Sequence, residues 1–176
     1  MSLPPYSLKP FLTSAQLNDR IKELATQIDA EFKGEEVTAV FLLNGAMFFG
    51  IDLIRQLDSP LIVDTLSASS YEGTVSTGVI KIHSDLKTVI TGKNVLIIED
   101  IIDTGQTLNS ILHFIEQKQP KKVVTVCLLD KPSQRKVDVK VEYVGFTIEN
   151  HFVVGYGLDY NQFFRNLKEI SIYCPE

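Results

Sequence analysis

The chain has 176 residues, 44% of them hydrophobic and 22% charged, which predicts one domain with a sizeable core and argues against disorder as the dominant state. Its net charge of −5 argues against a general nucleic-acid-binding protein, which normally carries a basic face. No apolar run approaches the ~20 residues that span a bilayer, and residues 1–5 lack the features of a signal peptide. Two cysteines indicate neither a disulfide framework nor a zinc site. We therefore expect a cytoplasmic protein that binds neither nucleic acid nor a membrane.

The first predicted element is a helix. Thr13 and Gln16 stand in capping-box positions at its start, and Gly34 supplies a stop signal after it. Between them, apolar residues recur every three or four positions, the spacing of one buried helix face. They are Leu17, Ile21, Leu24, Ile28 and Phe32.

Apolar runs separated by breakers predict alternating strands and helices over the rest of the chain. A second helix is expected over 47–57, and a third after Gly105, ended by Pro120. The stretch 69–78 is polar and contains glycine, which predicts a mobile excursion. The expected strands occupy 37–43, 61–67, 79–82, 94–98, 123–129, 141–148 and 170–173.

Strand–helix–strand alternation with short connections predicts an α/β fold with a mainly parallel central sheet flanked by helices on both faces. Ligands of such sheets bind at the carboxyl ends of the strands. The candidate site is therefore expected in the loops that follow Leu43, Ile98 and Leu129.

The loop over 99–107 has the composition of a phosphate cradle. It lies between a predicted strand and a predicted helix, whose start offers free backbone N–H groups and the positive end of a dipole. Thr104, Gly105 and Thr107 are small, so an anion can approach the backbone closely, and the two threonines add hydroxyl donors.

Carboxylates precede this cradle. Glu99 and Asp100 suit sugar hydroxyls, or a hard cation such as Mg2+ held together with substrate oxygens. Asp103 stands between the acids and the cradle, where it can accept a proton from a ligand. The alternative interpretation is a helix N-cap by Asp103 or Thr104, with two solvated acids before it.

Residues 95–105, VLIIEDIIDTG, resemble the phosphoribosyl-diphosphate signature of type I phosphoribosyltransferases. Further stretches are similar to the 6-oxopurine enzymes of that family, the hypoxanthine-guanine phosphoribosyltransferases. They comprise a purine-binding part and a flexible catalytic loop, within a similarity that covers about 37–173. These stretches are Leu129-Asp130-Lys131, 152–160 (FVVGYGLDY), 161–165, Ser70-Tyr71 and Ser76-Thr77-Gly78.

The resemblance implies the type I phosphoribosyltransferase fold in a single domain over 1–176. Residues 1–12 and about 150–176 would build a small hood. The implied reaction belongs to purine salvage: the 5-phosphoribosyl group passes from phosphoribosyl diphosphate to hypoxanthine or guanine, giving IMP or GMP plus pyrophosphate. Mg2+ is the implied cofactor, and a homodimer or homotetramer the implied assembly.

The resemblance also implies which residues bind phosphoribosyl diphosphate. Asp103 would double as general base for the purine ring proton. Asn44 stands where the family usually has a basic residue, so the loop's backbone N–H groups would meet pyrophosphate, beside a peptide bond that is often cis in the family. The implied set is Glu99, Asp100, Asp103, Thr104, Gly105, Gln106, Thr107, Asn44, Gly45, Ser70, Tyr71 and Arg165.

The implied purine-binding set is Lys131, Phe152, Val153 and Asp159, and the implied metal ligands are Glu99, Asp100 and Asp159. Lys131 would donate to the 6-oxo group, Phe152 would stack on the base, and Asp159 would hold a second Mg2+. Without the resemblance, other interpretations are open. Lys131 and Asp159 would be turn residues at the surface, Phe152 a core residue, and Arg165 a charge on a helix face.

Two rival functions remain open from the residues alone. A regulator with the same pocket would bind RNA or DNA, but it should show an extended basic surface. An enzyme of the same fold could instead use xanthine or adenine. A cationic donor at Lys131 fits an oxo group better than an amino group, which argues against adenine.

Overall fold

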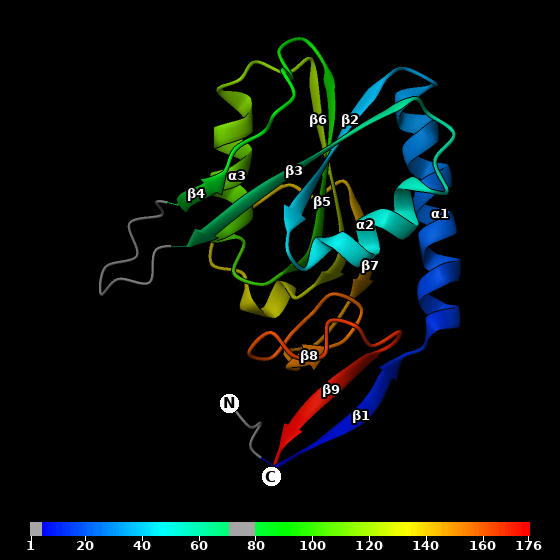
Figure 1. Ribbon diagram of the computed structural model, residues 1–176, viewed down its shortest axis with the longest axis vertical. Helices are drawn as coiled ribbons and strands as arrows, with labels where there is room; N and C mark the ends of the chain where they lie inside the picture. Colours follow the sequence, from blue (N-terminus) through cyan, green and yellow to red (C-terminus); the bar gives the residue numbers. More distant parts are fainter. Residues whose placement is uncertain (1–4, 71–79) are drawn as a thin grey trace.

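The protein, seen in a computed structural model that describes residues 5–70 and 80–176, contains two sheets and three α-helices in that part of the chain (Figure 1). The helices are α1 (Ser14–Phe32), α2 (Ala46–Ile54) and α3 (Gln106–Glu116), with a 3-10 turn at Pro132–Gln134. The strands are β1 (Tyr6–Leu12), β2 (Val37–Leu43), β3 (Leu61–Ser70), β4 (Ile80–Ser84), β5 (Asn94–Ile102), β6 (Lys122–Asp130), β7 (Tyr143–Thr147), β8 (Val153–Val154) and β9 (Ile170–Pro175).

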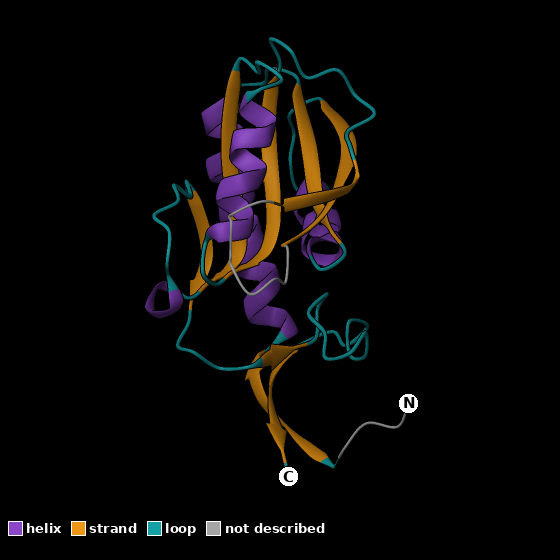
Figure 2. Cartoon of the chain, turned by 90° about the vertical axis from the view of Figure 1, so that its left-hand side faces the viewer, coloured by secondary structure: helices purple, strands orange, loops and turns teal. Residues whose placement is uncertain are grey.

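The central sheet has the order β4-β3-β2-β5-β6-β7 and is parallel except for β4, which runs antiparallel to β3. Alternate residues of β2 belong to different cores. Phe41 packs in the cluster that contains α1 and α2 residues, whereas Val40 and Leu42 pack in the cluster that contains α3 residues. Helices therefore cover both faces of the sheet, and the predicted α/β fold is confirmed (Figures 1 and 2).

Helix α1 forms as the sequence predicts. The capping box is present, with Thr13 Oγ1 accepting from Gln16 N and Gln16 Oε1 accepting from Thr13 N. The helix ends at Phe32, and Lys33 takes the left-handed conformation at φ 52°. The predicted apolar positions are all buried, together with Ala25.

Several element ends differ from their predictions. The excursion expected from 69 begins later, because Ser69 and Ser70 still pair with Lys81 and Ile80 in β3 and β4. The rest of that excursion, 71–78, and the first residue of the strand expected over 79–82 lie outside the described residues. Strand β5 runs four residues beyond its predicted end, to Ile102, because Glu99, Ile101 and Ile102 still pair with β6. Helices α2 and α3 end before their predicted stops, at Ile54 and Glu116.

The terminal segments form a second, antiparallel sheet in the order β1-β9-β8. Of its strands, only β9 was predicted from the sequence. Both views place this sheet beyond the carboxyl ends of the parallel strands (Figures 1 and 2). Its role as a hood and the single-domain organisation over 1–176 stay predictions. No helix within 5–70 and 80–176 is long and apolar enough to cross a membrane.

Candidate active site

The chain changes direction within the central sheet between β2 and β5. It leaves β2 outward to β3 and β4, then returns to pair β5 with the other edge of β2. Ligands of open α/β sheets bind at such a switch point. The loop after β2 and the end of β5 touch there: a Cβ atom at Gly45 would lie 1.6 Å from Asp100 Oδ2, so any larger residue would displace the Asp100 carboxylate.

The loop after β5 encloses a small cavity of about 90 Å³. Its lining residues are Glu99, Ile101, Ile102, Asp103, Thr104, Gly105, Thr107 and Leu108. Gly105, at φ 80°, is the N-cap of α3 and makes no side-chain capping bond. The interpretation of Asp103 or Thr104 as the N-cap is therefore wrong. Instead, Thr104 Oγ1 accepts a 3.4 Å hydrogen bond from Gln106 N.

Two carboxylates lie side by side at the end of β5. Glu99 Oε1 accepts from Asp100 N at 3.1 Å, and Asp100 Oδ1 accepts from Ile101 N at 2.9 Å. Burial, and then the charge of Asp100, raise the pKa of the Glu99 carboxyl well above its usual value. A bound cation would relieve both effects.

The donor set suits Mg2+. Carboxylate oxygens are hard ligands, and Mg2+ usually takes one or two carboxylates and completes its shell with water and substrate phosphates. Within the described ranges, no cluster of three or more His, Cys, Asp or Glu residues could hold a metal without such help. Glu99 and Asp100 thus fit a metal that arrives with its substrate.

The connection after β6 braces the loop after β5. Arg135 forms an ion pair with Asp130 and donates from Nη1 to the Asp103 carbonyl oxygen at 3.0 Å. The next two backbone N–H groups, at 136 and 137, both donate to the Thr104 carbonyl oxygen, at 2.9 and 3.2 Å. Nothing in the sequence pattern pointed to Arg135, because its partners lie 5 and 32 residues away.

Lys131 begins the same connection. Its backbone N–H donates to the Ile102 carbonyl oxygen at 2.9 Å, which ties the end of β6 to the end of β5. The residue is 6% exposed, so it is not the solvated turn lysine that remained possible from the sequence. A buried ammonium suits recognition of a polar ligand group.

The segment after β8 packs on the loop after β2. A Cβ atom at Gly157 would lie 2.1 Å from the Gly45 carbonyl oxygen, and the Tyr156 hydroxyl donates to Asp52 Oδ2 of α2 at 2.6 Å. Val153 is buried in β8, where it pairs with Ile172 of β9. The predicted purine-binding stretch therefore lies against the predicted pyrophosphate loop.

Phe152 is 52% exposed, so it is not an ordinary core residue. Its ring meets those of Tyr160 and Tyr173 edge-on, with centroids 5.8 and 6.0 Å apart. These neighbours hold one edge and leave much of the side chain open. That arrangement leaves room for a planar ligand to stack.

Asp159 and Arg165 bind each other. Arg165 Nη2 lies 2.8 Å from Asp159 Oδ1, and its Nη1 donates to the Gly157 carbonyl oxygen at 2.6 Å. Asp159 Oδ2 also accepts from Gln162 N at 2.8 Å. Arg165 lies in an irregular segment between β8 and β9, so its interpretation as a helix-face charge is wrong.

Of the remaining predicted residues, Asn44, Gln106 and Thr107 are fully described by the structure, whereas Ser70 and Tyr71 are not. Asn44 is exposed at the carboxyl end of β2, and its peptide bond with Leu43 is cis, as the resemblance implied. Gln106 and Thr107 open α3. The backbone of Ser70 ends β3, whereas its side chain and all of Tyr71 lie outside what the structure describes.

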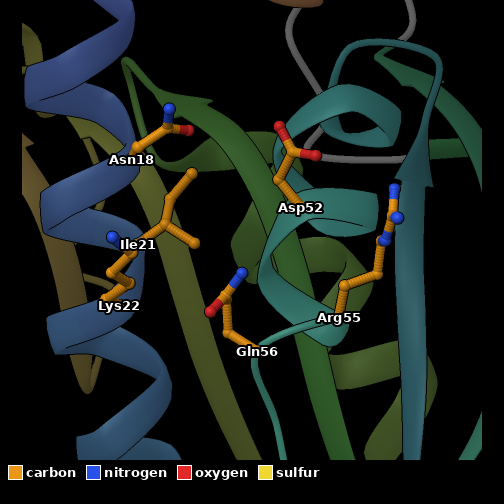
Figure 3. A pocket seen from close by; sticks show the side chains of 6 residues that line it. All are labelled: Asn18, Ile21, Lys22, Asp52, Arg55 and Gln56. Atoms are coloured by element: carbon orange, nitrogen blue, oxygen red, sulfur yellow. The ribbon is translucent and has the colours of Figure 1, made fainter.

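A larger hollow of about 410 Å³ lies between α1 and the end of α2 (Figure 3). It is lined by Asn18, Ile21, Lys22, Asp52, Arg55 and Gln56. None of these belongs to the predicted site, and its Asp52 carboxylate is already engaged by Tyr156. Volume alone therefore does not identify the functional site.

Residues 10–161 match the model of the phosphoribosyl transferase domain, and the chain belongs to this family. It is 43% identical, over 94% of its length, to a hypoxanthine-guanine phosphoribosyltransferase of Staphylococcus aureus strain Mu50, of which it covers 93%. A crystal structure of a hypoxanthine-guanine phosphoribosyltransferase from Bacillus anthracis superposes with a TM-score of 0.91 at 41% identity, covering 96% of this chain and 99% of that one. The resemblance inferred from the sequence and the type I fold are thus confirmed.

A relative of different size is the bifunctional protein TilS/HprT of Listeria innocua serovar 6a. It is 44% identical over 96% of this chain, yet the chain spans only 26% of that protein's length. The similarity thus concerns about a quarter of the bifunctional relative.

Proposed function

We propose that the chain is a hypoxanthine-guanine phosphoribosyltransferase of purine salvage. It transfers the 5-phosphoribosyl group of phosphoribosyl diphosphate to hypoxanthine or guanine and releases pyrophosphate. The observation that carries this proposal is the meeting of three segments at the carboxyl ends of β2 and β5. Gly45 contacts both Asp100 at the end of β5 and Gly157 of the predicted purine-binding stretch.

The loop after β5 binds the 5′-phosphate. Thr104, Gly105, Gln106 and Thr107 surround it with small side chains, hydroxyls and the N–H groups that open α3. The weak capping of this helix supports the assignment: its N-cap is a glycine, and the Gln106 N–H donates only a long 3.4 Å hydrogen bond to Thr104 Oγ1.

Glu99 and Asp100 hold the ribose hydroxyls, directly or through Mg2+. When bound, Mg2+ neutralises charge on the pyrophosphate leaving group. The pyrophosphate also meets the backbone N–H groups of Asn44 and Gly45, and Arg165. Arg165 would give up its contact with Asp159 to bind the pyrophosphate, and Asp159 would be the residue that holds a second Mg2+.

The base lies between Lys131 and Phe152. The ammonium of Lys131 donates to the 6-oxo group, backbone groups of Val153 meet the base edge, and Phe152 stacks on the ring. Asp103 accepts the ring proton, or stabilises the charge that develops there, as the purine nitrogen attacks the anomeric carbon. Ser70 and Tyr71 are proposed to close over the reacting centre, because water would hydrolyse an activated ribose.

The test is a nucleotide-formation assay with Mg2+, phosphoribosyl diphosphate and each of four purines. We expect product from hypoxanthine and guanine, little from xanthine and none from adenine. Product from adenine alone, or from no purine, would contradict the proposal. A nucleic-acid shift that weakens with salt would instead favour the regulator.

We also propose a homodimer or homotetramer in the cytoplasm. Met47 and Ile51, one turn apart on α2, are 39% and 42% exposed, and Val63 of β3 is 50% exposed. Apolar side chains of this size at the surface fit a contact with a second copy. Sedimentation should show more than one chain per particle, and Ile51→Lys should shift the particle toward the monomer. Cell fractionation tests the compartment.

A further inference from the structure

Arg135 joins two loops of the candidate site. Its Nη2 pairs with the carboxylate of Asp130, the last residue of β6, while Nη1 donates to the Asp103 carbonyl oxygen at 3.0 Å. The side chains are 19% and 14% exposed for Arg135 and Asp130. The pair is therefore shielded from solvent, and screening weakens it less than it weakens a surface pair.

The same arginine also supports the turn into α3. A Cβ atom at Gly105 would lie 3.0 Å from Arg135 Cδ and 2.7 Å from the Val137 carbonyl oxygen. The backbone N–H groups of Lys136 and Val137 hold the Thr104 carbonyl oxygen. Residues 103–105 are thus held from one side by a single short segment that Arg135 anchors.

We propose that Arg135 is a positioning residue of the reaction. It fixes the main chain at Asp103, and with it the Asp103 carboxylate, relative to the end of β6 where Lys131 recognises the base. This inference rests on the proposed function. Arg135 touches neither substrate in this scheme and acts through Asp103 and Asp130.

The geometry calls for arginine rather than lysine. One planar guanidinium donates to the carboxylate of Asp130 and to a carbonyl oxygen of another loop at the same time. A lysine ammonium is a point charge on a flexible stem, so it can keep the pair with Asp130 and still lose the fixed distance to Asp103. Misplacing a reacting group by about 1 Å can cost about 100-fold in rate.

The first measurement is steady-state kinetics of Arg135→Lys and Arg135→Gln. We expect kcat to fall about 10-fold for lysine and about 100-fold for glutamine. The KM for hypoxanthine should stay within about twofold, because Lys131 keeps its own backbone bond to Ile102. Equal losses in purine binding and in kcat would overturn the proposal.

Asp130 should act only through Arg135. Asp130→Asn leaves an oxygen that accepts from the guanidinium, so we expect a kcat loss of about fivefold or less. The double variant Asp130→Asn/Arg135→Gln should match Arg135→Gln within about twofold. If the kcat losses of the two single variants multiply in the double variant, Asp130 does not act only through Arg135.

Arg20 provides a matched control. It donates from Nε to the Gly145 carbonyl oxygen and from Nη2 to the Val144 carbonyl oxygen, both at 2.8 Å, and pairs with Glu23. It therefore makes the same kinds of contact, but between α1 and β7. Arg20→Lys should lower Tm and leave kcat unchanged, and an equal kcat loss in both lysine variants would reduce Arg135 to a structural role.

Hydrogen exchange separates this inference from the proposed function. Arg135→Gln should speed exchange of the amides of 103–107 in the unliganded protein, whereas Arg20→Gln should not. A wild-type protein that forms no nucleotide would refute the proposed function. Faster exchange of the 103–107 amides in Arg135→Gln would still support the inference that Arg135 holds this loop in place. Unchanged exchange of these amides in Arg135→Gln would overturn that inference.

Discussion

Acidic residues at the two ends of the central sheet have pKa values shifted in opposite directions. At the amino end, Glu31 accepts from Lys122 and from the Tyr143 hydroxyl, and Glu35 accepts from Lys121 and Asn94. Hydrogen bonds from these lysines lower the pKa of both glutamates. At the carboxyl end, burial and the neighbouring Asp100 raise the pKa of Glu99.

We interpret this contrast as a difference between carboxylates that stabilise the fold and carboxylates that are proposed to bind a ligand. The amino-end acids find their cations within the chain. Glu99 and Asp100 at the end of β5 are crowded together, and a cation or hydroxyl groups from a ligand would stabilise their charge. Substitutions at both ends of the sheet test this difference.

Asp103→Asn should have the largest effect on turnover. The amide cannot accept the ring proton, so we expect kcat to fall about 100- to 1000-fold while binding of phosphoribosyl diphosphate changes less than about threefold. Steady-state kinetics and calorimetry measure the two quantities. Asp19→Asn, on the exposed face of α1, is the control and should change neither. Equal losses in both quantities would rule out the proton-accepting role.

Lys131→Ala should weaken purine binding selectively. Removing a buried cationic donor leaves the 6-oxo group unpaired, so we expect the KM for hypoxanthine to rise about 10- to 100-fold. Binding of phosphoribosyl diphosphate should be nearly unchanged. Lys121→Ala at the amino end gives the comparison and should leave both constants alone. An unchanged purine response would remove Lys131 from the site.

Glu99→Gln should raise stability and lower activity. Because the pKa of Glu99 is raised in the folded state, ionisation destabilises the fold. That penalty is absent below the unfolded-state pKa of about 4.3, grows as pH rises toward the folded-state pKa, and is complete above it. The metal-free variant should therefore melt above the wild type at pH 8 and with it at pH 4. A lower Tm at pH 8 would show that Glu99 is already satisfied.

Glu31→Gln should act in the opposite direction and more weakly. Its pKa is lowered in the folded state, so its contribution to stability is present above about pH 4.3 and is lost as pH falls through the folded-state value. We expect a small fall in Tm at pH 7 that disappears in acid and shrinks with salt. Thermal melts at two pH values check this sign, and activity should not change.

The sequence was sufficient to predict the strands of the mainly parallel central sheet and the buried face of α1. It was insufficient for the terminal sheet. Strand β1 contains Pro10, lies at an edge and has a register shift next to that residue, so no clean alternation exists to read. Strand β8 has two residues, too few for any period. Strands β3 and β5 were predicted too short, because backbone pairing continued into polar residues.

For the site, residues contiguous in sequence were easier to predict than residues joined by the fold. The cavity after β5 gathers predicted residues that lie within ten positions of one another. Arg135 escaped prediction because its role depends on a contact with a carbonyl oxygen 32 residues away. The mutual pairing of Asp159 and Arg165 was missed for a related reason: each was assigned a ligand, and an ion pair between them has no signature in one sequence.

Gly45 is in close contact with two other stretches of the chain. Its Cα faces the Asp100 carboxylate, and its carbonyl oxygen faces Gly157. Three stretches of chain meet there without space for one methyl group. An engineer who wants another base specificity must therefore transplant these stretches together as one block. A single stretch exchanged for one with a different backbone path would lose these close approaches.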